Sequence, residues 1–249
     1  MKICRFRKDD QIYIGIVQGQ EIWVCDAALR KTEELWYIDE VELVAPAVPS
    51  KIVCVGRNYA EHAKELGNEV PTEPLLFLKA PSAIIATGDE ILIPFQSLHV
   101  EHEGELAVVI GRRCKNIADD DDPLSYVLGY TCLNDVTARD LQRKDVQFTR
   151  AKSFDTFCPI GPFVETELDV ADVRVTSAVN GQIRQDGRTS QMVFPVAFLV
   201  RYISRQMTLE AGDVIATGTP SGVGRLVPGD VCEITVEGIG TLKNEVANA

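Results

Sequence analysis

Two glutamates separated by a single residue open an apolar segment in the middle of the chain. Glu103 and Glu105 lead into residues 106–110, a run typical of a β-strand. Strand side chains alternate between two faces, so both carboxylates are expected on the same face. Neighbouring anions on a half-buried surface repel each other, and a hard divalent cation would neutralise them. Asp135, which follows the apolar stretch 126–133, is a candidate third oxygen ligand.

Spacing alone leaves this ligand set open. Glu101 falls on the same predicted face as Glu103 and Glu105, and a solvated edge-strand face without any metal is an equal interpretation. Carboxylate oxygens favour Mg²⁺, Mn²⁺ or Ca²⁺ over zinc. Three such ligands would leave coordination positions for water and substrate.

A histidine and a glutamate form a second candidate constellation. His62 and Glu65 lie three residues apart on a predicted helix that Asn58 would cap and Gly67 would end. A carboxylate beside an imidazole raises its basicity and fixes its orientation, as a general base requires. An ordinary surface ion pair is the alternative. Lys152 is likewise either a surface residue or a buried cation facing an anionic substrate.

The remaining elements indicate an α+β, mostly β protein. Short alternating segments over residues 2–25 predict a small β module, which a linker at 44–49 separates from the rest. We therefore expect two domains, residues 1–48 and 49–249. A second helix is predicted at 195–205 and a short one within 135–143. Further strands are expected at 51–55, 75–79, 91–93, 105–111, 127–133, 173–179, 213–217 and 231–236.

Composition excludes several classes of function. The net charge of −12 argues against a nucleic-acid partner. No segment approaches the roughly 20 apolar residues that span a bilayer, and the amino terminus lacks the apolar core of a signal peptide, so a cytoplasmic protein is expected. Seven cysteines without a C-x-x-C pair favour buried apolar residues over disulfides or structural zinc. Residues 217–224 lack the ending of a P-loop, and 119–122 lack the spacing of an EF-hand.

Six segments, taken in order, resemble the fumarylacetoacetate hydrolase superfamily over roughly residues 50–246. One such motif carries little weight, whereas six in the family's order are specific. The segments are VGRNYAEH (55–62), EGELAVVIG (103–111), DVTARD (135–140), AKSFD (151–155), VNG (179–181) and TGTPSGVG (217–224).

The resemblance implies a three-layer β roll with few helices, a small leading β module and assembly as a homodimer. It implies a Mg²⁺ cofactor, with Mn²⁺ possible in its place, and leaves Glu101 outside the ligand set. By position, the matching residues are Glu103, Glu105 and Asp135 as metal ligands, His62, Glu65 and Lys152 as catalytic residues, and Arg139, Gln142 and Thr219 as substrate contacts.

The implied substrates are small dicarbonyl acids: 2-oxo acids with a β-carbonyl or β-carboxylate, converted through an enolate that the metal stabilises. Our first hypothesis is acylpyruvate C–C hydrolysis, oxaloacetate decarboxylation, or both. The alternatives are an oxaloacetate keto–enol tautomerase and a 2-hydroxyhepta-2,4-diene-1,7-dioate isomerase. A non-catalytic metal and carboxylate binder is the hypothesis from another class. Arg184 and Arg188 are interpreted as surface residues rather than as a site for a distal carboxylate.

Overall fold

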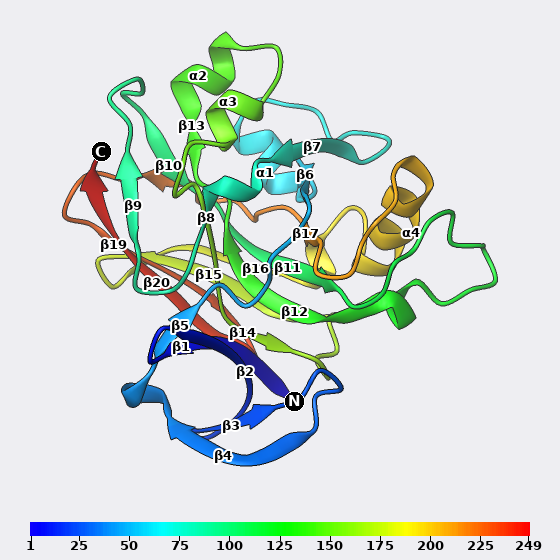
Figure 1. Ribbon diagram of the computed structural model, residues 1–249. Helices are drawn as coiled ribbons and strands as arrows, with labels where there is room; N and C mark the ends of the chain where they lie inside the picture. Colours follow the sequence, from blue (N-terminus) through cyan, green and yellow to red (C-terminus); the bar gives the residue numbers. More distant parts are fainter.

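The structure is a computed structural model that describes all 249 residues, Met1–Ala249. Strands dominate, and the helices are few and short (Figure 1). None of the helices is long and apolar enough to cross a membrane. The helices are α1 (Ala60–Glu65), α2 (Arg139–Lys144), α3 (Thr149–Lys152) and α4 (Val196–Gln206), with 3-10 turns η1 (Ile38–Glu40), η2 (Pro81–Ala83), η3 (Pro123–Tyr126) and η4 (Thr189–Gln191).

The largest sheet has twelve strands and runs through the whole molecule in the order β4-β3-β2-β1-β14-β12-β11-β17-β6-β7, with β5 beside β1 and β8 beside β14. Its strands are β1 (Lys2–Lys8), β2 (Gln11–Gln18), β3 (Glu21–Cys25), β4 (Lys31–Tyr37), β5 (Glu42–Val44), β6 (Ile52–Gly56), β7 (Leu75–Lys79), β8 (Ile84–Ile85), β11 (Gly104–Ile110), β12 (Val127–Asn134), β14 (Cys158–Glu165) and β17 (Val214–Ala216).

Two smaller sheets complete the fold. A five-stranded sheet, β16-β15-β19-β20-β9, packs its β15, β19 and β20 against β11, β12 and β14 of the large sheet. A three-stranded sheet, β13-β10-β18, lies beside the carboxyl end of β12. The strands are β9 (Glu90–Ile93), β10 (Val100–His102), β13 (Thr137–Ala138), β15 (Arg174–Val179), β16 (Gln182–Arg188), β18 (Gly224–Arg225), β19 (Val231–Val236) and β20 (Gly240–Asn248).

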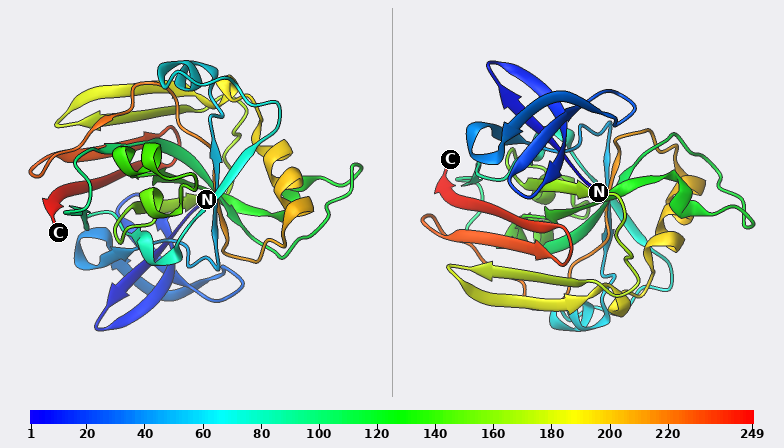
Figure 2. Two further views of the ribbon diagram at one scale, coloured as in Figure 1. Left: turned by 90° about the horizontal axis from the view of Figure 1, so that it is seen from above. Right: turned by 90° about the horizontal axis from the view of Figure 1, so that it is seen from below.

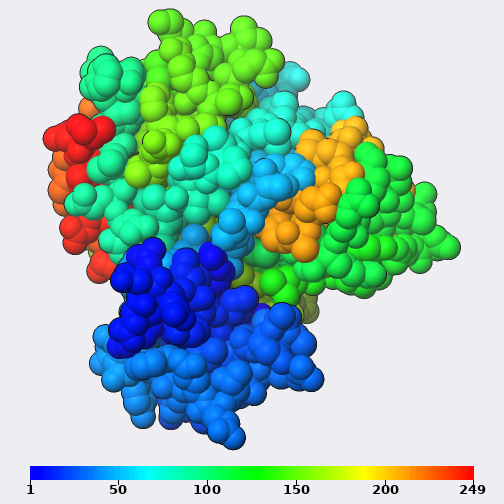
Figure 3. Space-filling view, in the orientation of Figure 1, coloured from blue at the N-terminus to red at the C-terminus, as the bar shows by residue number.

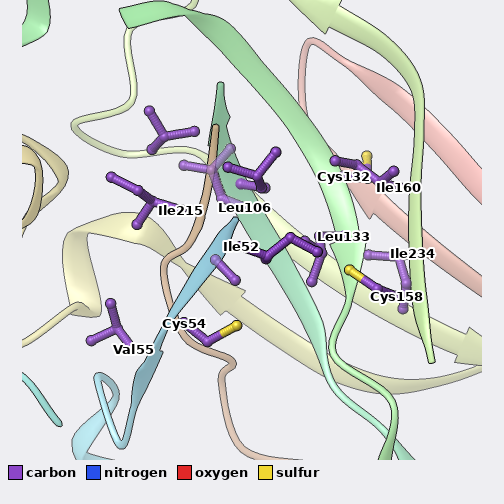
Figure 4. Close-up of a cluster of buried hydrophobic side chains, with 14 of the residues drawn as sticks. Ile52, Cys54, Val55, Leu106, Cys132, Leu133, Cys158, Ile160, Ile215 and Ile234 are labelled. Carbon is purple, nitrogen blue, oxygen red and sulfur yellow. The ribbon is translucent and has the colours of Figure 1, made fainter. Parts of the chain in front are cut away.

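The hydrophobic core lies between the large and the five-stranded sheet. Leu106 of β11 and Cys132 of β12 share the face of the large sheet that covers β19 with its Ile234 (Figure 4). Every residue of β11 is buried, because both faces of this central strand are covered. Our expectation of a half-buried strand is therefore wrong. The strand has no solvent-facing side, and Glu105 within it and Glu103 just before it are both buried.

Helix α4 covers a further part of the core at one side of the molecule (Figure 2). Its buried residues Val196, Leu199, Val200 and Ile203 recur at intervals of three and four, the spacing of one helical face. The predicted helix at 195–205 is confirmed, with Pro195 in the cap position just before the first turn.

The amino-terminal strands form a lobe that projects from the rest of the surface (Figure 3). The three strands expected over residues 2–25 are present, and β4 and β5, which the sequence analysis did not predict, follow them. Cys4, Phe6, Ile22 and Val24 make a small apolar cluster of their own. The lobe nevertheless shares the large sheet, because β1 pairs with β14. The division at residue 48 stays a prediction.

The predicted strands of the larger region are all present with small shifts of their ends. All seven cysteines are free and buried, as expected. The predicted capping box at Asn58 is wrong, because Tyr59 occupies the cap position of α1. The Asn58 side chain is fully buried and instead donates to the carbonyls of Phe194 (3.0 Å) and Thr217 (2.7 Å) and accepts from the Phe194 amide (2.8 Å). Asn58 thus joins three chain segments that lie far apart in the sequence.

Replacing Asn58 should be costly for stability. Asn58→Ala removes three hydrogen bonds and leaves buried backbone groups without partners, so we expect the free energy of unfolding to fall by about 2–4 kcal/mol. Urea denaturation of both proteins measures this difference. Asn68→Ala, which removes only a weak contact to Leu66 at 3.4 Å, is the control and should stay within about 0.5 kcal/mol of the parent. A loss equal to that of the control would contradict the role given to Asn58.

Candidate metal centre and active site

The register of β11 and β12 brings the three predicted ligands together. Gly104 pairs with Asn134, so Glu103 and Asp135, one step beyond each strand end, stand opposite one another. The Asp135 amide donates to the Glu103 carbonyl at 2.8 Å, which extends the ladder by one rung. The carboxylates of Glu103, Glu105 and Asp135 are buried, and one oxygen of each lies within 4.8 Å of the others. The predicted cluster is thus a feature of the fold.

Three cations surround this cluster. The Lys152 Nζ lies 2.7 Å from both Glu103 Oε2 and Asp135 Oδ2. The Lys79 Nζ lies 2.6 Å from Asp135 Oδ1, and Arg139 Nη2 lies 2.6 Å from Glu103 Oε1. Lys152 is therefore a buried cation rather than a surface residue, and its contact with an anionic substrate stays a prediction.

Glu101 lies outside the cluster. Its carboxylate faces away to Arg139 Nε at 2.7 Å and to His99 Nε2 at 2.8 Å. The strand face that the sequence assigned to all three glutamates is interrupted between β10 and β11, so Glu101 belongs to a different sheet from Glu105. This is why spacing alone did not separate it from the other two.

The cluster remains short of positive charge. Besides the imidazole of His99 next to Glu101, the four carboxylates face three lysine and arginine cations, which leaves one carboxylate without such a cation. The carboxylates are those of Glu101, Glu103, Glu105 and Asp135, and the cations are Lys79, Lys152 and Arg139. That carboxylate belongs to Glu105. Its only hydrogen bond comes from the Gly218 amide to Oε2, at 2.8 Å.

The pKa values follow from this uneven distribution. Burial would raise the pKa of Glu103, but Lys152 and Arg139 outweigh it and hold that pKa well below its usual range. Burial would lower the pKa of Lys152, but Asp135 and Glu103 raise it to about 12. Burial, followed by the charges of Asp135 and Glu103, raises the pKa of Glu105 well above its usual value. Glu105 is thus the ligand that most requires a further cation to stay ionised.

The His62–Glu65 pair is present on α1. His62 Nδ1 lies 3.2 Å from Glu65 Oε2, and the Glu65 carboxylate also accepts from the Gly222 amide at 3.0 Å. A carboxylate only accepts, so Nδ1 is the donor and a neutral His62 presents the lone pair of Nε2. Gly222 is needed at this contact, because a Cβ on it would lie 2.1 Å from the Arg184 carbonyl oxygen. The His62 side chain is buried, which argues against the alternative that His62 and Glu65 form an ordinary surface ion pair.

One cavity of about 370 Å³ is lined by residues of both the carboxylate cluster and the His62–Glu65 pair. The nine residues that the sequence singled out line it together, and Leu75, Phe77 and Phe148 supply apolar wall. The nine are His62, Glu65, Glu103, Glu105, Asp135, Arg139, Gln142, Lys152 and Thr219. The roles of these residues in catalysis and binding stay predictions. Arg188 pairs with Asp172 at 2.7 Å, and neither it nor Arg184 lines the cavity.

Two residues of this site were missed by the sequence analysis. Lys79 reads as the last residue of an ordinary strand, and only the neighbourhood of β7 and β6 turns it toward Asp135. Gln185 is fully buried, accepts from the Gly104 amide at 2.9 Å and donates to Thr219 Oγ1 at 2.7 Å. Gln185 therefore ties the strand of the glutamates to the loop of Thr219. The sequence held one sign of the role of Lys79: a lysine ends the otherwise apolar strand LLFLK (75–79).

Comparison with known families decides the classification. Residues 51–247 match the fumarylacetoacetate (FAA) hydrolase C-terminal family, and residues 1–46 match the family described as Rv2993c-like, N-terminal. The chain belongs to the fumarylacetoacetate hydrolase family. The predicted superfamily and the predicted mostly β fold are thereby confirmed.

Individual relatives of this family member carry different names. The chain is 43% identical to a Bacillus subtilis protein named oxaloacetate tautomerase YisK, over 85% of this chain and 75% of the relative. It is 48% identical to a Dictyostelium discoideum protein named oxaloacetate decarboxylase, mitochondrial, over 77% and 90%. A crystal structure titled 5-carboxymethyl-2-hydroxymuconate delta-isomerase, from Mycobacterium smegmatis, superposes over all of both chains with a TM-score of 0.93 and 42% identity.

The uncompensated Glu105 charge yields a prediction about metal binding. Glu105→Gln keeps an acceptor for the Gly218 amide and removes repulsion from Asp135 and Glu103, so the metal-free variant should be at least as stable as the parent. Its stabilisation by Mn²⁺ should disappear, whereas the parent should gain about 2.7 kcal/mol at a hundredfold excess over Kd. Denaturation in chelator and in Mn²⁺ measures both. Exposed Glu245→Gln should behave as the parent, and an unchanged Mn²⁺ effect in Glu105→Gln would contradict the ligand assignment.

Proposed function

We propose that this protein is a divalent-metal enzyme that converts 2-oxo acids carrying a β-carbonyl or β-carboxylate through an enolate. The observation that carries the proposal is the meeting of a buried three-carboxylate cluster, a buried lysine and an oriented histidine on one cavity. A binding protein would need the first two of these features. It would not need a histidine held by a carboxylate, since that arrangement serves proton transfer.

The donor set fits a hard cation. Glu103, Glu105 and Asp135 offer oxygen atoms only, lie close together and retain an uncompensated negative charge. When bound there, Mg²⁺ or Mn²⁺ would act as a Lewis acid that polarises the oxo group of the substrate. Oxygen ligands do not discriminate strongly between these two ions.

The residues of the chain account for charge and protons. The Lys152 ammonium, buried among Glu103 and Asp135, provides fixed positive charge beside the place where a substrate oxygen becomes negative. The Lys152 Nζ also lies 5.1 Å from the centre of the Phe77 ring, which restrains it. His62 Nε2 is the group that exchanges a proton with substrate or water. Glu65 holds the tautomer of His62 that this step requires.

The names of the relatives support oxaloacetate as the substrate to test first, in keto–enol tautomerisation or decarboxylation. Both reactions share the enolate. Tautomerisation of the enol needs only loss of the proton on its oxygen and addition of a proton at C3. Acylpyruvate hydrolysis is the second candidate. The His62–Glu65 pair favours it, because the same base would activate a water for attack on the second carbonyl.

Three substrates separate these reactions. The Mg²⁺-loaded protein is given enol-oxaloacetate, oxaloacetate and acetylpyruvate, and we expect enol–keto conversion or pyruvate release that stops in chelator. His62→Asn should lower the rate of the active reaction by about 10²–10⁴-fold, since it removes the base. Glu61→Gln, an exposed change on the same helix, should leave the rate within twofold. Full activity of His62→Asn, or full activity in chelator, would overturn the proposal.

A further inference from the structure

The arginine predicted to bind substrate is already occupied. Arg139 Nε donates to Glu101 Oε2 at 2.7 Å, Nη2 to Glu103 Oε1 at 2.6 Å and Nη1 to Gln142 Oε1 at 2.6 Å. Each nitrogen of the guanidinium thus has an acceptor within the protein. A substrate carboxylate would have to compete with two buried glutamates, and the loss of either ion pair in a buried setting is expensive. Arg139 is therefore better suited to holding Glu103 than to holding substrate.

Two other arginines line the same cavity and have no partner. Arg57 and Arg143 form neither an ion pair nor a side-chain hydrogen bond. They differ in this from surface arginines such as Arg150 and Arg174, which are paired in bidentate fashion with aspartates. An unpaired guanidinium at a cavity wall is a ready site for a carboxylate, which it can bind through two parallel hydrogen bonds.

The backbone of Arg57 provides a separate observation. Its φ is +58°, in the left-handed region that favours glycine, and it is the one non-glycine cavity residue with this conformation. A side chain there costs of the order of 1 kcal/mol relative to glycine. The neighbouring Asn58, clamped to Phe194 and Thr217, fixes the loop in this shape. A residue that persists at a local cost in a rigid cavity wall points to a function for its side chain.

We propose that Arg57, together with Arg143 on the wall of the same cavity, binds a second carboxylate of the substrate, at the end opposite its 2-oxo acid group. This inference rests on the proposed function and narrows its substrate class to 2-oxo dicarboxylic acids and their enols. The 2-oxo acid end of the substrate faces Glu103, Glu105, Asp135 and Lys152. The distal carboxylate faces Arg57, which is half-buried, and Arg143, which is exposed and contributes less.

A matched pair of stable ligands tests the subsite without relying on turnover. 2-Oxoglutarate and 2-oxopentanoate have the same chain length and differ only in a terminal carboxylate or methyl group. Titration calorimetry on the Mg²⁺-loaded protein should give at least tenfold tighter binding of the dicarboxylate. Arg57→Asn removes the charge, and asparagine tolerates a left-handed backbone. This variant should weaken the binding of 2-oxoglutarate by about ten- to a hundredfold and leave the affinity for 2-oxopentanoate within twofold of the parent.

Further variants separate the subsite from a structural role. Arg57→Gly should lose the same discrimination while raising the denaturation midpoint, because glycine relieves the backbone. Arg57→Lys should retain part of it. Arg184→Met is the matched control, since Arg184 is also unpaired but lies outside the cavity, and it should bind both ligands as the parent does. If Arg57→Asn weakens the binding of both ligands equally, or of neither, the proposed subsite is wrong.

The two experiments also distinguish failure of the subsite from failure of the proposed function. If the parent turns over none of the three test substrates but prefers 2-oxoglutarate in an Arg57-dependent way, the subsite stands and the proposed function fails. If the parent turns over substrate but binds the two 2-oxo acids equally, the proposed function stands and the subsite fails.

Discussion

The burial of four carboxylates against three lysine and arginine cations is the constraint on which the rest of the site depends. Removing charged groups from water is costly, and their attraction to lysine and arginine repays this only when the pairing is complete. Here it is complete for Glu101, Glu103 and Asp135 and incomplete for Glu105. A divalent cation would complete it. We therefore propose that the site is stable enough to fold and retains the negative charge that a metal ion would neutralise.

The fold meets this constraint through the edges of its sheets. Glu103 and Asp135 stand one rung beyond paired strand ends, where a ligand can reach them, while β11 continues as fully buried strand behind them. Gln185 and Asn58, both fully buried amides, tie that rung to the 217–222 loop and to α1. These two residues make no contact with the carboxylates. They set the distances between the groups that do.

Much of this site could be predicted from the sequence, because its residues lie in short segments with strong local character. The alternation of strand side chains placed Glu103 near Glu105, and the helical i, i+3 spacing placed His62 near Glu65. The position of Asp135 after an apolar stretch made it a candidate third ligand. The resemblance to a family then left out Glu101, which spacing had kept as an equal candidate. Pairing of strands distant in the sequence then brought these segments together, and no local pattern encodes that pairing.

The residues that escaped prediction are those whose role arises only from tertiary contacts. Lys79 ends an ordinary apolar strand. Its ammonium group pairs with Asp135 because β7 lies beside β6, next to the cluster. Asn58 has the composition of a helix cap and acts instead as a clamp. Arg139 was predicted to contact substrate, whereas Arg57, in another of the family segments, was given no role. Which of them is occupied and which is free becomes evident only from the partners around each guanidinium.

The most direct test of this account is anomalous diffraction from crystals soaked in Mn²⁺ and, separately, in chelator. The account predicts one strong Mn²⁺ peak about 2.1 Å from carboxylate oxygens of Glu103, Glu105 and Asp135, absent in chelator. It also predicts that the Lys152 ammonium gives up at least one of its two carboxylate contacts when the ion is bound. A peak elsewhere, or a cluster that stays metal-free at saturating Mn²⁺ with Lys152 in place, would contradict the claim that these carboxylates form a metal centre.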